Sequence, residues 1–285
     1  MAIQSPVVQQ RWLRSELRRA RERSSATQKD VADALDWSTS KVIRIETGAV
    51  GVSTTDLRAL LAFYGITDKA VIDQMIEAAK GLRREAWWDR YRGSLSPQFL
   101  TEISYEASSI RLRQYQTQVV PGLLQTEQYA RQLMSVFDEE PGRIELGVRV
   151  RLERQEQLIR EGGPELYFVL DEAVIRRWMG GPDVLRRQLN HLRVVAERPN
   201  VHIQVLPFSA GGHRGMFGSF TLFEFPLEEQ DFAVRVEHSG PDVLIRDNPE
   251  EISFYLETFF ELEAIALPKG DLDTVIDKVL SELPD

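Results

Sequence analysis

The chain has 285 residues, of which 42% are hydrophobic and 28% are charged, so it can bury a sizeable core, and its composition excludes intrinsic disorder. It contains no cysteine, which excludes disulfides and thiolate metal sites and favours a reducing cytoplasm. No run approaches the roughly 18 apolar residues of a membrane span, and the N-terminus lacks the apolar stretch of a signal peptide. We therefore expect a cytoplasmic protein with no membrane contact.

The net charge of −9 is unevenly distributed along the chain. Residues 1–64 contain 10 Lys and Arg against 7 Asp and Glu, a net charge of +3. The remaining residues contain 25 against 37, a net charge of −12. A basic N-terminal part on an acidic remainder fits a small nucleic-acid module joined to a domain with another task. A random scatter of these few charges is the alternative.

Residues 1–80 are predicted to form a bundle of five helices. Apolar residues recur at helical spacing over 8–23, 28–35, 38–47, 57–64 and 69–82. Thr27 and Ser38 are expected to be N-caps, and residues 53–56 form a variant of the capping box. Gly48 stands where a left-handed residue would end the third helix. This part therefore predicts an all-α domain.

The third helix is predicted to expose a face suited to DNA. Val42 and Ile45 point to one side and are expected to face the core. The exposed side of the helix offers hydroxyls, an isoleucine and an arginine without any acid, which suit base edges and thymine methyls in a major groove. We expect the residues that read bases to be Thr39, Ser40, Ile43, Arg44 and Thr47. Ser38 and Lys41 are expected to hold phosphates at the start of this helix.

Residues 27–48, TQKDVADALDWSTSKVIRIETG, resemble the helix-turn-helix of lambda-repressor-like (Xre-type) transcriptional regulators. The matching positions are Thr27, Gln28, Ala32, Leu35, Ser38, Val42, Ile45, Glu46 and Gly48. The resemblance implies that Gln28 contacts phosphate and supports the recognition helix. It also implies that Glu46 pairs with Arg18 or Arg21 of the first helix. The turn position, commonly glycine in the family, is Asp36, which tolerates a left-handed conformation less well. A helical bundle that binds no nucleic acid is the alternative.

Residues 81–98 are expected to be a linker with a hinge helix around Trp87 and Trp88, followed by a second domain over 99–285. Helical runs are predicted over 100–115, 125–134, 143–160, 182–196, 248–267 and 271–283. Strand-like runs are predicted over 166–170, 201–208, 218–225, 232–238 and 242–247. Helices, then clustered strands, then helices indicate an α+β fold with a mainly antiparallel sheet.

Several strings in this second part, among them AWWDRYR, VPGLLQTEQYAR, LDEAVIRR and ERPNVHIQVLPFSAGGH, resemble an uncharacterised C-terminal domain of many actinobacterial helix-turn-helix regulators. The resemblance spans roughly residues 87–267. Members of that group often lie beside a gene for a small partner protein that modulates DNA binding, in some cases described as an antitoxin–toxin pair, and the resemblance implies such a partner here. No catalytic residues accompany the resemblance, so none are transferred.

The sequence offers little support for enzymatic chemistry. The four histidines, His191, His202, His213 and His238, show no metal-ligand spacing, so we expect neither a metal nor a cofactor. The glycine-rich stretch 208–220 joins two strands and therefore cannot be a P-loop type of phosphate cradle. Its His213, Arg214 and Met216 suggest a loop that binds a ligand or partner, with a plain mobile connection as the alternative. We expect that the protein is not an enzyme.

The sequence-level hypothesis is therefore a sequence-specific regulator that binds double-stranded DNA. One such module buries a small interface, so a homodimer on two half-sites is expected. The second domain is expected to bind a small regulatory protein. Two alternatives stay open: a repressor that senses a small molecule through the second domain, and an enzyme that carries a DNA-targeting module.

Overall fold

The structure is a computed structural model that describes residues 6–81, 86–226, 231–238, 242–245 and 248–284. Contacts within the chain divide it into two compact units, residues 1–108 and residues 109–285. The division falls ten residues beyond the boundary expected at 98, so two short helical elements join the first unit.

The regular structure among the described residues of the first unit is helical, apart from one isolated bridge between Arg92 and Leu95. Its α-helices are α1 (Pro6–Arg23), α2 (Gln28–Leu35), α3 (Thr39–Thr47), α4 (Thr54–Phe63), α5 (Lys69–Gly81) and α6 (Pro97–Glu106), and a 3-10 turn, η1 (Trp87–Tyr91), lies between the last two. The core of α1 to α5 is formed by one apolar stripe from each helix. Its buried members include Leu13, Leu17, Val31, Val42, Ile45, Leu57, Leu60, Leu61, Met75 and Ile76. Burial of these stripes fixes how the short helices pack.

Side-chain caps set the helix starts in this unit. The Thr27 hydroxyl accepts from the Asp30 backbone amide, and the Asp30 carboxylate accepts from the Thr27 amide, which completes a capping box. Ser53 accepts from the Asp56 amide at the start of α4. These caps satisfy amides that have no partner within a short helix.

The expected hinge helix is a single 3-10 turn. In η1, Trp88 and Tyr91 are buried, and the Trp87 ring meets the Trp88 ring edge-on at a centroid distance of 5.7 Å. Residues 82–85 of the expected linker lie outside the described residues. Trp87 and Trp88 therefore pack against each other within this turn.

The second unit is built on a six-stranded mixed sheet with the order β3-β2-β1-β4-β5-β6. The strands are β1 (Arg111–Gln116), β2 (Glu165–Asp171), β3 (Val201–Leu206), β4 (Phe220–Phe225), β5 (Asp231–Val236) and β6 (Val243–Ile245). The pairings β1–β4, β4–β5 and β5–β6 are antiparallel, while β1–β2 and β2–β3 are parallel. The predicted α+β fold with a mainly antiparallel sheet is confirmed, and two parallel pairings are added to it.

The single helix predicted over 100–115 was wrong, because α6 ends at Glu106 and a central strand follows. Strand β1 has the sequence RLRQYQ, in which four of six residues are polar, so its burial cannot be recognised from hydrophobicity. Arg111 and Arg113 both bond Glu224 of the neighbouring strand β4, which makes a buried polar strand acceptable. The strand expected over 242–247 is described as β6 from Val243 to Ile245, and residues 246 and 247 lie outside the described residues.

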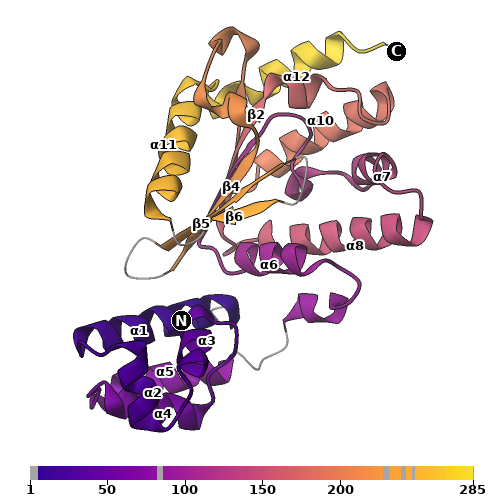
Figure 1. Ribbon diagram of the computed structural model, residues 1–285. Coiled ribbons are helices and arrows are strands. Elements are labelled where there is room, and N and C mark those ends of the chain that lie inside the picture. Colours follow the sequence, from indigo (N-terminus) through magenta and orange to yellow (C-terminus); the bar gives the residue numbers. More distant parts are fainter. Residues whose placement is uncertain (1–5, 82–85, 227–230, 239–241, 246–247, 285) are drawn as a thin grey trace. The chain divides into compact units, whose positions relative to one another are not determined.

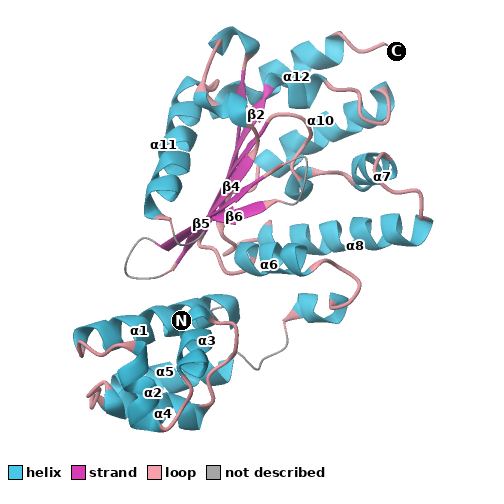
Figure 2. Cartoon of the chain, viewed as in Figure 1, coloured by secondary structure: helices cyan, strands magenta, loops and turns pink. Residues whose placement is uncertain are grey.

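Helices cover the sheet on both sides (Figures 1 and 2). Helix α11 (Pro249–Ile265) packs on one face through Phe259 and Leu262, against strand residues that include Tyr115, Val169, Phe220, Leu222 and Val234. On the other side lie α8 (Pro141–Leu158) and α10 (Pro182–Ala196). The remaining α-helices are α7 (Glu127–Ser135), α9 (Glu172–Arg176) and α12 (Leu272–Ser281). The short 3-10 turns of this unit are η2 (Gly122–Leu124), η3 (Phe208–Ala210), η4 (Arg214–Phe217) and η5 (Lys269–Asp271).

Candidate nucleic-acid interface

Helix α3 is held against the first unit by a short apolar side. Val42 and Ile45 are both buried, and they pack in the core with residues of α1, α2 and α4. The Ser38 hydroxyl accepts from the Lys41 amide at 3.2 Å and starts the helix. Asp36 in the preceding turn is left-handed, with a φ of 54° and a ψ of 44°. The local sequence thus fixes both the start and the inward side of α3.

The outward side of α3 places the five predicted base-reading residues in solvent. All of them are exposed: Thr39, Ser40, Ile43, Arg44 and Thr47. The Arg44 Nε donates to the Ser40 carbonyl oxygen, and the Thr47 hydroxyl donates to the Ile43 carbonyl oxygen at 2.8 Å. Thr47 therefore offers only oxygen lone pairs outward, whereas Thr39 and Ser40 are exposed on the first turn. The only acid of α3 is Glu46, which is largely covered by its partners.

The three residues predicted to hold phosphates have intramolecular partners. Gln28 Nε2 donates to Glu46 Oε2 at 2.8 Å, and Ser38 caps α3. Lys41 Nζ lies 2.9 Å from Asp56 Oδ1 of α4 and 3.7 Å above the centroid of the Trp37 ring. Lys41 is therefore paired with Asp56 in the free protein, and a phosphate would have to displace that carboxylate. The two side chains are 33% and 27% exposed, and a partly exposed ion pair contributes little stability, so the exchange costs little.

Glu46 connects α3 to both α1 and α2. Arg21 Nε lies 2.7 Å from Glu46 Oε1, and Arg21 Nη2 lies 3.2 Å from Glu46 Oε2. Of the two arginines considered, Arg18 does not make this pair, because it lies on the exposed side of α1 and bonds Glu22. Burial raises the pKa of the neighbouring Tyr64 to about 12, and the Glu46 charge adds to the effect.

Two residues of α1 hold the end of α3, and the sequence reasoning missed both. Gly48 ends the helix with a φ of 73°. Arg14 Nη1 donates to the Thr47 carbonyl oxygen, and Gln10 Nε2 donates to the Gly48 carbonyl oxygen at 3.5 Å. These bonds satisfy carbonyls at the negative end of the helix dipole. The only signal in the sequence was the spacing of Gln10 and Arg14, which lie one turn apart on the first helix.

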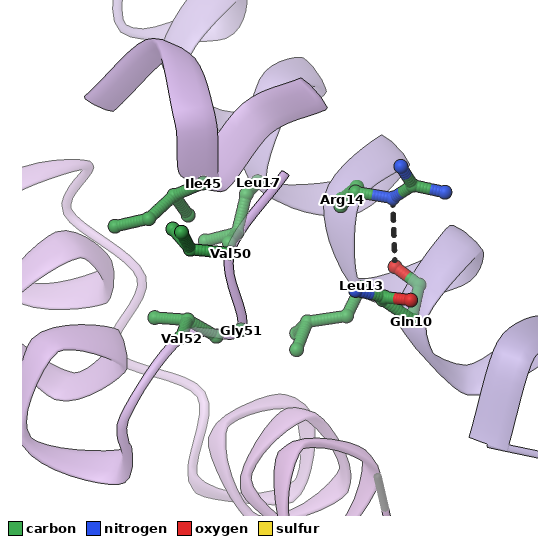
Figure 3. Close-up of a pocket in the computed structure, with 8 residues that line it drawn as sticks. All are labelled: Gln10, Leu13, Arg14, Leu17, Ile45, Val50, Gly51 and Val52. Atoms are coloured by element: carbon green, nitrogen blue, oxygen red, sulfur yellow. Dashed lines mark hydrogen bonds between the residues drawn. The ribbon is translucent and has the colours of Figure 1, made fainter. Parts of the chain in front are cut away.

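A small cavity lies beside this end of α3 (Figure 3). Its volume of about 10 Å³ is close to that of a single water site. It is lined by Gln10, Leu13, Arg14, Leu17, Ile45, Val50, Gly51 and Val52. Most of the lining is apolar and belongs to the bundle core. The cavity is thus a packing gap behind the interface and too small for an effector.

The structure also locates the sequence candidates in the second unit. His213 meets the Tyr115 ring edge-on at 6.1 Å, and Arg214 Nη1 lies 3.2 Å from Glu261 Oε1 of α11. Met216 is exposed, and His202 Nε2 lies 3.1 Å from Glu165 Oε2. Among the described residues, no cluster of three or more potential ligands could hold a metal ion.

The fold of the first unit and the exposed face of α3 define a helix-turn-helix domain, a class of domain typical of DNA-binding regulators. Residues 12–74 match a family described as a helix-turn-helix domain. Residues 99–278, more than half of the chain, match a family described as a domain of unknown function (DUF5753), and the chain belongs to that family. No curated protein and no solved structure matches the chain. Within the described part of the chain, no helix is long and apolar enough to cross a membrane.

Proposed function

We propose that the protein is a sequence-specific transcriptional regulator that places α3 in the major groove of its operator. The observation that carries the proposal is the outward side of α3, where Thr39, Ser40, Ile43 and Arg44 are exposed without an acid among them. Arg pairs with guanine, hydroxyls accept or donate to base edges, and an isoleucine surface contacts thymine methyls. A rigid helix is needed for such readout, and Glu46 and Gly48 supply its attachment at the far end.

Phosphate contacts would come from the beginning of α3. A helix N-terminus attracts anions, and the Ser38 hydroxyl accepts from the Lys41 amide, so its own proton stays available for donation. Lys41 would exchange Asp56 for a phosphate oxygen when DNA arrives. The ion pair with Asp56 would balance the charge of Lys41 in the free protein. Lys41 would turn toward DNA only when a phosphate replaces Asp56.

The proposal includes a homodimer and a regulatory second unit. A single helix-turn-helix buries a small DNA interface, so two copies on two half-sites would supply the missing affinity. The second unit would bind a small regulatory protein encoded by a neighbouring gene, a role that the sequence resemblance supports. It would bind without catalysing a reaction. A small-molecule signal is the competing proposal for this unit.

The test is a selection of bound DNA by the full chain, followed by affinity measurements on the selected operator. Arg44→Ala should weaken operator binding by about 1–3 kcal/mol and relax the preference at one base position. Lys41→Ala should weaken all sequences alike and lower the salt slope by about 1. Lys80→Ala, which removes an exposed cation from α5, is the matched control. Unchanged operator binding in both α3 variants would contradict the proposal.

A further inference from the structure

The loop between β3 and β4 presents two large apolar side chains to solvent. Met216 is 71% exposed and Phe217 is 92% exposed, side by side in the turn η4. Single exposed apolar side chains are common, but contiguous ones bordered by charged groups are typical of contact surfaces. This loop is also where sequence reasoning placed a ligand or partner site.

The loop is fixed in place behind these two side chains. Gly215 is buried, and a Cβ atom there would lie 2.5 Å from Tyr115 Cε1 and 3.0 Å from Leu262 Cδ1. The backbone therefore rests directly on the sheet and on α11, an approach that only glycine allows. Arg214 adds ion pairs to Glu261 at 3.2 Å and to Glu257 at 3.9 Å. The loop thus holds its apolar residues ready for a partner, which lowers the entropic cost of binding.

The helix under the loop is strongly acidic. Helix α11 contains five glutamates and no lysine or arginine. Its exposed Phe254 lies under the Arg214 guanidinium, 5.9 Å from ring centroid to Cζ. Arg214 can neutralise only one of its two glutamate partners. The surface formed by Met216, Phe217, Phe254, Glu257 and Glu261, here called the η4–α11 surface, therefore combines apolar side chains with negative charge.

From this combination we infer that the η4–α11 surface binds a basic amphipathic segment of a partner protein, with apolar side chains on Met216 and Phe217 and Lys or Arg opposite Glu257 and Glu261. A second copy of this chain fits poorly, because a two-fold contact would bring two copies of the same acidic surface together. This inference deepens the proposed partner-binding role of the second unit and rests on it.

The test uses two labelled 18-residue peptides titrated into the full chain. Both peptides carry leucine at helical spacing. All remaining positions are lysine in the first peptide and glutamate in the second. The lysine peptide should bind at least tenfold more tightly, and added salt should weaken it. Phe217→Asp should weaken the lysine peptide at least tenfold, since a central aromatic anchor is lost. The double change Glu257→Gln and Glu261→Gln should weaken it and flatten its salt dependence.

Phe137→Asp is the matched control, because Phe137 is 82% exposed on a different element of the same unit. It should leave peptide affinity within about twofold of the wild type. Equal effects of Phe137→Asp and Phe217→Asp, equal binding of both peptides, or no binding of the lysine peptide would overturn the inference. So would a sedimentation result in which Phe217→Asp converts a dimer to a monomer. Operator affinity is measured on the same variants, so that a failure of partner binding can be told apart from a failure of DNA recognition. Arg44→Ala should weaken operator binding without changing peptide binding.

Discussion

Arg21 of α1 and Glu46 of α3 form a two-point ion pair, with Nε–Oε1 and Nη2–Oε2 distances of 2.7 and 3.2 Å. The pair is well shielded, since the Arg21 side chain is 14% exposed and the Glu46 side chain 6%. Gln28 completes the set by donating to Glu46. One carboxylate therefore ties the recognition helix to both helices that precede it.

Removing that carboxylate should loosen α3. Glu46→Ala leaves Arg21 covered and without its partner, so we expect the first unit to lose about 3 kcal/mol of stability. Glu46→Gln keeps an acceptor for Gln28 and Arg21 and should cost about half as much. Amide hydrogen exchange of α2 and α3 in the full chain measures both changes. Arg18→Ala removes an exposed cation that pairs with Glu22, so it should change exchange little; a loss equal to that of Glu46→Ala would contradict the assigned role.

The end of α3 should be equally sensitive at Gly48. A Cβ there would lie 2.2–2.7 Å from atoms of the Arg14 side chain, and the φ of 73° disfavours any residue with a Cβ. Gly48→Ala should therefore cost about 2 kcal/mol and lower operator affinity, because α3 loses the Arg14 bond to Thr47. Gly51→Ala, three residues later, meets no atom within 4 Å and serves as the control. Similar thermal unfolding of the two variants would show that Arg14 does not hold the helix end.

The sequence was sufficient to predict the features of the first unit that depend on local spacing. The caps at Thr27 and Ser38, the buried pair Val42 and Ile45, and the left-handed Gly48 each depend on residues within one or two turns. The roles of Arg14 and of the Lys41–Asp56 pair could not be predicted this way. Both interactions connect separate helices, and the sequence contains several other cations that could have made either of them.

In the second unit, the sequence predicted the class of fold but not the centre of the sheet. Strand β1 was hidden because Arg111, Arg113, Gln114 and Gln116 make it look like a surface helix. Burial of those residues is possible only through partners more than 100 residues away, such as Glu224. The parallel pairing of β1 with β2 was equally unpredictable, since it depends on how the helices between them cross over.

Asp36 offers a test of strain in the turn before α3. With a φ of 54° it occupies the left-handed region, which costs a residue with a Cβ roughly 1 kcal/mol. Asp36→Gly should therefore stabilise the first unit by about 0.5–1 kcal/mol, after allowance for the added freedom of the unfolded chain. Asp36→Ala should destabilise it, because alanine lacks the local hydrogen bonding that helps aspartate in this region. Ser25→Gly, at the same φ of 54°, checks the reasoning at a second position. A fall in melting temperature for both glycine variants would refute it.

Glu224 should give the second unit a measurable acid sensitivity. Burial disfavours its charge, but hydrogen bonds from Arg113 and Arg111 outweigh burial and lower the pKa of Glu224 below its ordinary value of 4.5. A carboxyl group with a lowered folded-state pKa stabilises the fold above the unfolded-state pKa, and this contribution disappears as the pH falls through the folded-state value. The stability of the second unit should therefore decline as the pH drops below about 4.5.

Glu224→Gln isolates this contribution. The variant should be less stable at pH 7, because two arginines lose their shared carboxylate, and its stability should fall less steeply in acid. The difference in slope can reach about 1.4 kcal/mol per pH unit, the value for uptake of one proton. Urea unfolding followed between pH 7 and pH 3 measures both effects. Glu250→Gln removes an exposed carboxylate from the first turn of α11 and controls for the change in net charge. If its profile matches that of Glu224→Gln, the acid sensitivity arises from overall charge and not from the Arg111–Glu224–Arg113 cluster.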